Sequence, residues 1–396
     1  MRSARRKAMI SKTSVFLKES SVVLVKSGGV IIGILLSLTL IGLVTSIGRL
    51  AMGLGASTAL TDAYPWGIWI GFDFALIAFS GAGFTMAAVV HILHMKKFQP
   101  ALRPALLAGL LGYVAVLMLL LLDLGRPDRF YHFIIFWNLH SPLFEISWCV
   151  LLYTTILLIE ISPDLFGRLN WAWPVNVASR LMTPVAIIGI TLSTLHQSTL
   201  GTLYLNMPHR IHPLWYTPIL PLLFFVSSIM AGLSMAIIAY KISIRAQGKE
   251  ERCGVADGLA KGIAWVALLY VLLKLGDIVM AGELPALLAL DMASLLMGLE
   301  LVVGVILPMI LFFIPAARKN NLAQWFASAL ILFGVFMNRF TATVFAQKAP
   351  PGAAYSPHIL EWLSTIGLLA GVILAWYLAV RFLEIFKIRV SIKAGH

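Results

Sequence analysis

The sequence has few charged residues and very little cysteine. Only 12% of its 396 residues are Asp, Glu, Lys or Arg, whereas 60% are hydrophobic and the mean hydropathy is +0.92. Soluble domains carry about 25% charged residues, so this composition excludes an ordinary soluble protein and indicates an integral membrane protein. The two cysteines, Cys149 and Cys253, stand in no C-x-x-C or C-x-x-C-H pattern. The chain therefore lacks the ligands to hold an iron–sulfur cluster alone or to attach a c-type haem.

Several other kinds of site are missing from the sequence. It has no H-x-x-x-H pair for a metal and no G-x-S-x-G turn for a serine nucleophile. His196 has no partner for haem ligation at matched depth on another expected helix, because His91 and His94 fall on the other side of the membrane. We therefore predict no metal site and no haem in this chain. No segment between the apolar runs exceeds about 25 residues, which argues against a soluble domain.

Long apolar runs dominate the sequence instead. A helix needs roughly 20 mostly apolar residues to cross a bilayer. Pro, Gly, Trp and charged residues separate ten such runs. They are 29–51, 66–95, 104–124, 143–161, 181–202, 216–240, 262–280, 291–315, 324–345 and 359–383. We predict an all-α integral membrane protein with about ten transmembrane helices.

Lys and Arg residues give the expected helices a direction. Of the 30, 23 fall in segments on one side of the membrane, five fall on the other side, and two lie inside spans. Because basic residues gather in cytoplasmic loops, we expect a multi-pass protein of a prokaryotic inner membrane with both termini in the cytoplasm. The chain then divides into a cytoplasmic segment (1–28), a ten-helix membrane domain (29–385) and a cytoplasmic tail (386–396). The net charge of +13 reflects this topology, so we expect no nucleic-acid partner.

Ionisable residues inside the expected spans gather at one depth. A charged side chain at the bilayer centre costs about 3 kcal/mol, so each one needs a reason. Asp73 lies seven residues past Trp66, which is roughly 10 Å below the outer surface. Six further helices contribute Asp123, Glu145, His196, Lys274, Asp277, Arg339 and Glu361 to the same outer half. Glu300 is expected nearer the middle of the membrane.

Such a cluster has several interpretations. A quinone fits it, because the ring carbonyls need hydrogen-bond donors, the redox cycle takes up or releases two protons, and the tail needs apolar surroundings. A structural ion-pair network would also satisfy the charges. A secondary transporter or ion channel is the alternative function, although it would favour sites near the midplane on broken helices. A purely structural anchor would need no ionisable residues in its spans.

Seven motifs, in order along almost the whole chain, resemble the NrfD/PsrC (polysulfide reductase membrane subunit) family. They are "YPWGIWIGFDF", "ALRPALLAGLLGY", "DLGRPDRFY", "SPLFEISWCV", "TLHQSTLGTLY", "IHPLWYTPILPL" and "LLKLGD". The ten-span form is most similar to the branch that contains HybB, the membrane subunit of uptake hydrogenases. A DsrP-type subunit of a sulfite-reduction-linked complex is another candidate.

The resemblance implies a fold and a set of partners. Spans two to five and six to nine would form two four-helix bundles, flanked by spans one and ten. Menaquinone or ubiquinone would bind as substrate near the periplasmic face, with no haem or iron–sulfur cluster in this chain. A ferredoxin-like iron–sulfur subunit would dock on that face and exchange electrons with further catalytic or cytochrome subunits. The chain would then be the quinone-reactive part of an oxidoreductase complex in the lipid membrane, and not catalytic alone.

Five residues at family motif positions receive roles as hypotheses. His196 would hydrogen-bond a quinone carbonyl, and Asp73 and Glu145 would bind the quinone and exchange its protons. Tyr113 and Arg103 would begin a proton path inward. Ordinary helix packing explains Tyr113 as well, and a basic residue at a cytoplasmic helix end explains Arg103 as well.

The remaining charged residues receive supporting roles. Asp277 stands where the hydrogenase branch tends to have Glu, and it would assist proton transfer. Arg339 and Lys274 would form structural ion pairs with carboxylates and hold the shape of the pocket. Asp123 and Arg126 would cap and brace a loop.

Overall fold

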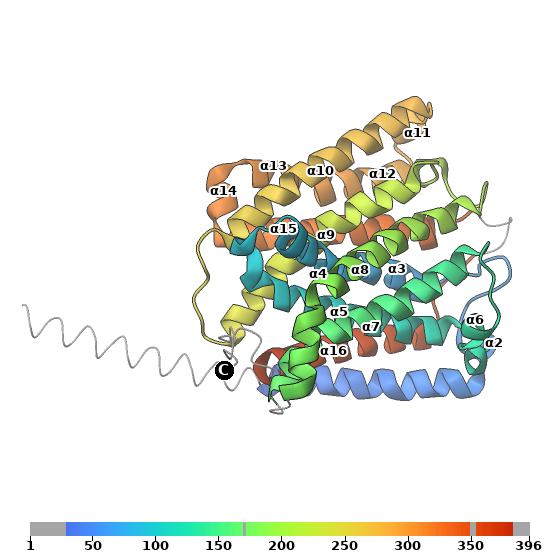
Figure 1. Ribbon diagram of the computed structural model, residues 1–396. Helices are drawn as coiled ribbons and strands as arrows, with labels where there is room; N and C mark the ends of the chain where they lie inside the picture. The colour runs from blue at the N-terminus through green and yellow to red at the C-terminus, as the bar shows by residue number, and fades with distance from the viewer. Residues whose placement is uncertain (1–28, 169–171, 349–353, 383–396) are drawn as a thin grey trace, which may run out of the picture.

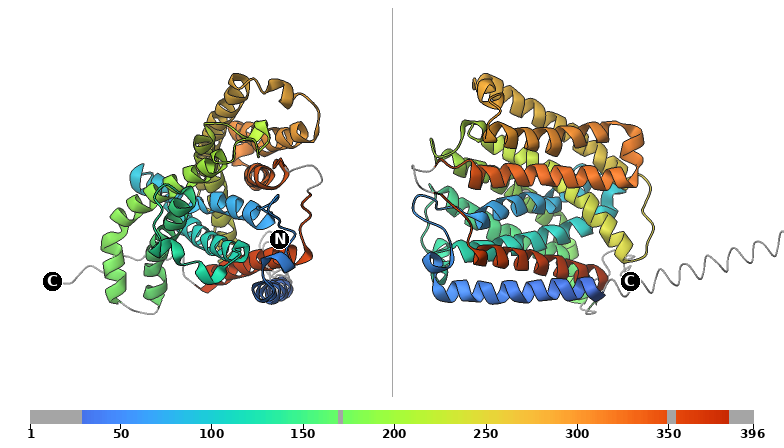
Figure 2. Two further views of the ribbon diagram at one scale, coloured as in Figure 1. Left: turned by 90° about the vertical axis from the view of Figure 1, so that its right-hand side faces the viewer. Right: turned by 180° about the vertical axis from the view of Figure 1, so that it is seen from behind.

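The computed structural model describes residues 29–168, 172–348 and 354–382. Within these ranges the protein is helical throughout, with two isolated β-bridges and no strand. The long helices run side by side along one direction (Figures 1 and 2), as expected for chains of apolar segments that each cross a bilayer. The predicted all-α membrane fold is confirmed. The predicted cytoplasmic segment and tail lie outside the described residues.

Nine helices in the described ranges are long and apolar enough to cross a membrane. They are Gly29–Met52, Ile68–Ile92, Lys96–Asp123, Pro142–Phe166, Leu220–Ala246, Val255–Met280, Met292–Phe313, Asn321–Phe345 and Ile359–Val380. Each matches one predicted run, because an apolar segment of that length can bury its backbone polar groups only as a helix.

Several of these spans are divided into shorter helical segments. The segments of the spans after the first, divided or not, are α3 (Ile68–Ser80), α4 (Ala82–Ala87), η1 (Ala88–Ile92), η2 (Lys96–Phe98), α5 (Gln99–Asp123), α7 (Pro142–Arg168), α9 (Leu220–Ala246), α10 (Val255–Met280), α12 (Met292–Gly298), η5 (Leu299–Ile306), α13 (Leu307–Phe313), α15 (Asn321–Phe340), η6 (Thr341–Phe345) and α16 (Ile359–Phe382). Of these, η1, η5 and η6 are π-helical, a conformation that often marks functional positions in a helix.

The tenth predicted span lies within α8 (Ala172–Leu205), a helix of 34 residues. It is not among the nine, and its part from Ser193 to Thr199 is rich in hydroxyl and amide side chains. Since α8 packs along α7 and α9, which are both candidate spans, we keep its membrane crossing as a prediction.

The helices form two groups that match the predicted bundles. In the first bundle α3 and α4 pack on α5, α5 packs on α7, and α7 packs on α8. In the second bundle α9 packs on α10 and α15, and these close on η5 and α13. Helix α9 also lies against α5 and α8, so the two bundles share a long interface. Helix 29–52 (blue) and α16 (red) lie together at one edge of the molecule in Figure 1.

Short helices mark the two ends of the molecule. One end carries η2 and α14, and we call it the basic end; the other end carries α2, α6 and α11, and we call it the opposite end. These short helices are α14 (Pro315–Lys319), α2 (Leu54–Ser57), α6 (His132–Ile135) and α11 (Leu284–Leu287), with η3 (Pro127–Arg129) and η4 (Pro213–Trp215) also in loops. In Figure 1 the basic end is on the left. The charge bias predicts that the basic end is cytoplasmic.

Candidate functional site

Six buried polar residues meet in the interior of the first bundle, and most of their polar atoms have no hydrogen-bond partner. We call them the first-bundle cluster: Asp73 of α3, Tyr113 of α5, Tyr153 of α7, and Ser193, His196 and Gln197 of α8. None is more than 1% exposed. Each unsatisfied buried polar atom costs about 1–3 kcal/mol, so a group of them at one place requires an explanation.

The imidazole of His196 lies at the centre of this cluster. Both of its ring nitrogens are buried without a partner. Its ring centroid lies 5.9 Å from that of Tyr113, which in turn meets the Tyr153 ring edge-on at 5.0 Å. Ser193 lies one turn from His196 on the same face of α8, next to the two tyrosine hydroxyls. Two unpartnered imidazole nitrogens and three neighbouring hydroxyls therefore lie in one interior.

Asp73 and Gln197 complete the cluster toward the opposite end. Asp73 is 1% exposed, and its Oδ1 has no hydrogen-bond partner. Gln197 Nε2 donates to the backbone carbonyl of Ile77 at 2.9 Å, one turn past Asp73 on α3. This bond fixes the amide so that Gln197 Oε1 remains unpaired in the interior. The cluster thus offers a carboxylate, an amide oxygen, hydroxyls and an imidazole in an otherwise apolar bundle.

Glu145 lies at the rim of this cluster. Glu145 is an exposed residue on the first turn of α7, and its Oε1 accepts a hydrogen bond of 2.7 Å from the Thr199 hydroxyl. Thr199 is three residues past His196 on α8, so Glu145 and the cluster share one side of that helix. The structure therefore places Glu145 between the cluster and the exposed surface.

Arg103 lies far from Tyr113. It forms an ion pair with Asp164 of α7 near the basic end, and its side chain is 37% exposed. Ten residues of α5 separate Arg103 from Tyr113, which is about 15 Å along the helix. The pairing favours a structural role for Arg103, and the sequence did not point to Asp164 because the contact joins two different helices.

The second bundle contains a separate polar network around Glu300 of η5. Glu300 is 1% exposed and accepts hydrogen bonds from three side chains of other segments. The donors are Trp215 Nε1 at 3.1 Å, Asn338 Nδ2 at 2.8 Å and the Tyr270 hydroxyl at 3.4 Å. A buried carboxylate with several donors is stable in an apolar bundle.

Arg339 and Lys274 belong to this second network. Arg339 donates to Asn338 Oδ1 at 2.5 Å and to Ser227 Oγ at 2.7 Å, and its guanidinium lies 3.3 Å from the centroid of the Phe224 ring. Lys274 donates to the carbonyl of Leu214 at 2.7 Å. Within the described residues, neither cation has a carboxylate within 4 Å, so the expected direct ion pairs are replaced by a chain that runs through Asn338 to Glu300.

Asp277 and the flanking carboxylates share no hydrogen bond with either group, although the charge of Asp277 is close enough to Lys274 to interact with it. Asp277 accepts a bond of 2.5 Å from Thr217 near the end of α10. Glu361 of α16 accepts bonds from the Ala59 amide at 2.9 Å and the Tyr355 hydroxyl at 2.6 Å, which fastens α16 to the loop before α3. The outer-half residues predicted to meet are therefore divided among two bundles and a flanking helix.

Asp123 and Arg126 lie at the end of α5. Arg126 pairs with Asp128 at 2.9 Å, and both side chains are exposed, so this pair braces the loop. The Arg126 guanidinium holds the pKa of Asp128 below its usual range. Asp123 Oδ1 has no partner, and Arg49 nearby donates to the carbonyl of Leu124 at 2.6 Å.

Tyr204 joins the two bundles, and the sequence gave no sign of this role. Its hydroxyl donates to Thr343 Oγ1 at 2.5 Å, and Thr343 in turn donates to the Arg339 carbonyl at 2.6 Å. Its ring packs edge-on against Phe74 of the first bundle and also contacts Phe224 of the second, with centroids 5.5 Å away in each case. These two hydrogen bonds link Tyr204 of α8 to α15, the helix that carries Arg339.

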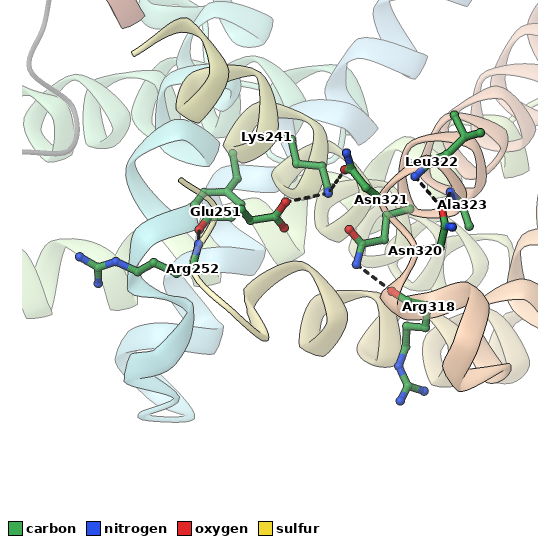
Figure 3. Close-up of polar contacts among 10 residues, drawn as sticks. Lys241, Glu251, Arg252, Arg318, Asn320, Asn321, Leu322 and Ala323 are labelled. Atoms are coloured by element: carbon green, nitrogen blue, oxygen red, sulfur yellow. Dashed lines mark hydrogen bonds and ion pairs between the residues drawn. The ribbon is translucent and has the colours of Figure 1, made fainter. Parts of the chain in front are cut away.

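Ion pairs at the basic end close the second bundle (Figure 3). Lys241 is 3% exposed, and its Nζ lies 3.1 Å from Glu251 and 2.6 Å from Asn321. Arg318 pairs with Asp257 at 2.8 Å. The Lys241 contacts join α9 to the start of α15, and the Arg318 pair joins α14 to α10. No group of three His, Cys, Asp or Glu residues in the described ranges could hold a metal ion.

Both bundles contain buried polar atoms without a partner, and in the second bundle these include Arg339 Nε, Ser328 Oγ and Thr341 Oγ1. Glu300 and its donors satisfy one another, as in a structural network. The first-bundle cluster leaves both ring nitrogens of His196 and Oδ1 of Asp73 without a hydrogen-bond partner. The sequence could have indicated Ser193 and Gln197, because they share a helical face with His196; Tyr153 carries no such signal.

These features define a polytopic membrane protein with a buried cluster of polar side chains inside its first four-helix bundle. A family model described as polysulphide reductase, NrfD, matches residues 56–350. The chain belongs to this family, and the resemblance seen in its motifs is confirmed.

Curated relatives match along most of the chain. A protein of Nitratidesulfovibrio vulgaris is 36% identical over 349 residues, which are 85% of this chain and 89% of the relative. The probable Ni/Fe-hydrogenase 2 b-type cytochrome subunit of Escherichia coli is 28% identical over 344 residues, covering 85% and 87% of the two chains. The menaquinone reductase integral membrane subunit of N. vulgaris is 27% identical over 372 residues, covering 87% and 88%.

Proposed function

We propose that this chain is the quinone-reactive membrane subunit of a respiratory oxidoreductase complex. The observation that carries the proposal is the first-bundle cluster, whose unpartnered donors and acceptors match the needs of a quinone ring. The names of the relatives support it, since one is the membrane subunit of a menaquinone reductase and another is a hydrogenase subunit.

Each residue of the cluster has a role in this proposal. A ring N–H of His196 donates to one quinone carbonyl, and the Tyr113 hydroxyl is placed to donate to the ring from α5. Asp73 exchanges protons with the bound substrate, because it is the carboxylate of the cluster. Bound quinone supplies the two-electron, two-proton chemistry. Glu145, next to Thr199 at the rim, carries protons between the cluster and the surface.

The electrons require a partner, because the chain contains no pattern for a cluster or haem of its own. We place the opposite end at the periplasmic face and the iron–sulfur subunit against it. Asp73 lies five residues from the start of α3 at that end, about 8 Å along the helix. A docked cluster can therefore approach the site closely, whereas the basic end is separated from it by most of the membrane.

The test uses His196→Ala and Asp73→Asn in the intact complex. Quinol-dependent electron transfer in membranes should fall by a factor of about 100 or more in each, since each removes a group that touches the substrate. His140→Ala and Asp62→Asn are matched controls, because both residues are exposed in loops. Subunit assembly is measured by affinity purification. Wild-type rates in assembled His196→Ala and Asp73→Asn complexes would exclude the cluster as the quinone site.

A further inference from the structure

A second group of charged side chains lies toward the opposite end, outside the first-bundle cluster. It consists of Arg49 near the end of helix 29–52, Asp123 at the end of α5 and Glu361 near the start of α16. Arg49 and Glu361 are each 1% exposed, whereas Asp123 is partly exposed. The proposed function gives none of the three a role, although ionisable side chains in membrane spans usually have one.

Arg49 holds a positive charge beside Asp123 without bonding to it. The Arg49 guanidinium donates to the carbonyl of Leu124 at 2.6 Å and lies 5.9 Å from the centroid of the Trp69 ring. Leu124 directly follows Asp123, and the charges of Arg49 and Asp123 are close enough to interact. Within the described residues, however, no carboxylate lies within 4 Å of Arg49. The carboxylate oxygens of Asp123 are therefore not taken up by this cation.

Asp123 differs from Glu361 in how its oxygens are used. Glu361 is fully buried and accepts hydrogen bonds from the Ala59 amide and the Tyr355 hydroxyl, as a structural carboxylate does. In Asp123, Oδ1 is buried with no hydrogen-bond partner, while the residue as a whole is partly exposed. A proton or a water molecule can satisfy such an oxygen. Asp123 therefore reaches both the protein interior and the surface.

Asp123 and Asp73 come from adjoining turns of α5 and α3. Leu119 lies one turn before Asp123 on α5, and Trp69 lies one turn before Asp73 on α3. Leu119 and Trp69 belong to the same buried apolar cluster, so the two carboxylates lie on either side of one contact between the helices. Their charges are close enough to interact. Because like charges repel strongly in apolar surroundings, one proton held between the two carboxyl groups is more favourable than none.

We propose that Asp123 passes protons between Asp73 and the surface at the opposite end while a quinone reacts at the first-bundle cluster. The inference rests on the proposed function. Oxidation of one quinol releases two electrons, which pass to the iron–sulfur partner, and two protons. Asp73 accepts a quinol hydroxyl proton on its carboxylate, and Asp123 receives that proton through bridging water and releases it at the surface. Quinone reduction runs the same steps in reverse. Glu145 stays the carrier on the α8 side of the cluster.

The experiment replaces Asp123 in the intact complex and measures kcat and KM with menadiol, a soluble quinol. Asp123→Asn keeps the size of the side chain and cannot carry a proton, Asp123→Glu keeps a carboxylate, and Asp123→Ala leaves space for added formate. Asp128→Asn is the matched control, because Asp128 is an exposed carboxylate five residues further along the chain. Affinity purification and thermal unfolding measure how much of each complex assembles and stays folded.

The expected result is a loss of turnover without a loss of quinol binding. In Asp123→Asn and Asp123→Ala, kcat falls about tenfold and KM stays within about twofold, whereas Asp123→Glu and Asp128→Asn keep kcat within about threefold of the wild type. Formate restores most of the lost kcat in Asp123→Ala, because a small carboxylic acid replaces the missing proton carrier. The double variant Asp73→Asn, Asp123→Asn falls no further than Asp73→Asn alone, since both residues act on one route.

Three outcomes would overturn the role of Asp123. They are a wild-type kcat in assembled Asp123→Asn, a loss in Asp123→Ala that formate does not reverse, and losses that multiply in the double variant, as two independent structural defects would. If Asp123→Ala does not assemble, Asp123→Asn and the double variant decide between these results. Wild-type turnover in assembled Asp73→Asn would instead contradict the proposed function, and this inference with it.

Discussion

The amide of Gln197 binds the backbone carbonyl of Ile77 across the first bundle, at 2.9 Å. This bond joins α8, which carries His196, to α3, which carries Asp73. Gln197 therefore fixes the distance between the helices that carry the two proposed site residues, although the sequence motifs gave Gln197 no role. A site that depends on such a cross-link is sensitive to changes that leave its reacting groups intact.

Gln197→Leu tests this link. The change removes the donor and keeps a similar volume, so we expect a loss of about 1 kcal/mol in the free energy of unfolding and a larger fractional loss in quinol turnover. Gln197→Glu keeps the length but removes the donated N–H, and it should reduce turnover as well. Thermal unfolding and steady-state kinetics of the purified complex give the two readouts. If the loss of turnover is no larger than the loss of folded complex explains, Gln197 has no positioning role.

Glu300→Leu should destabilise the second bundle strongly. It removes the carboxylate that Asn338 connects to Arg339 and leaves Lys274 with Asp277 as its remaining carboxylate neighbour, and breaking a buried charge network in this way costs about 3–5 kcal/mol. The double variant Glu300→Leu, Lys274→Met should recover part of that loss, because it removes one of the two buried cations. Asp62→Asn, at an exposed loop residue, is the control and should change stability little. Unfolding midpoints in detergent distinguish these outcomes.

Tyr204 variants separate its ring from its hydroxyl. Tyr204→Phe removes the bond to Thr343 and keeps the ring contacts, so it should cost about 1 kcal/mol. Tyr204→Ala removes the whole side chain from a fully buried position and should cost about 3–5 kcal/mol. If the two variants are equally stable, the ring does not hold the bundles together.

Asp291 gives a prediction for pH. Its side chain accepts a bond of 2.8 Å from the Ser294 amide at the start of α12, and this bond lowers the pKa of its carboxyl group. The cap therefore contributes fully above the usual pKa of an aspartate, and its contribution is lost as the pH falls through the lowered pKa. The protection of the Ser294 amide from hydrogen exchange, measured against the intrinsic exchange rate at each pH, should fall at low pH. In Asp291→Asn, which caps without a charge, the exchange should lose this dependence on carboxyl titration.

The helices were predictable from the sequence, and most contacts between them were not. Apolar length alone decides where a span lies, and each predicted run is helical in the structure. The depth of each side chain in the membrane stays a prediction, in which Asp73 and His196 lie near one level. The sequence did not show in which direction each side chain points around its helix. Glu145 was therefore predicted to join Asp73 and His196 in the interior, although it is exposed.

Contacts between distant segments were the hardest part. Asn338 stands between Arg339 and Glu300, and no local pattern indicates that an amide rather than a direct ion pair connects them. Asp164 likewise reaches Arg103 from another helix. The polar face of α8 is different, because Ser193, His196 and Gln197 recur at helical spacing and could have been read as one site.

The crossing of η5 and α15 limits where this protein can adapt to a bulky substrate. A Cβ on Gly304 would lie 2.3 Å from the Gly334 Cα, so the two backbones already touch and even a methyl group has no space. Because this crossing is closed, η5 and α15 cannot move closer together. Under the proposed function, we expect the space for a substrate to come from displacement within the first bundle rather than at this crossing.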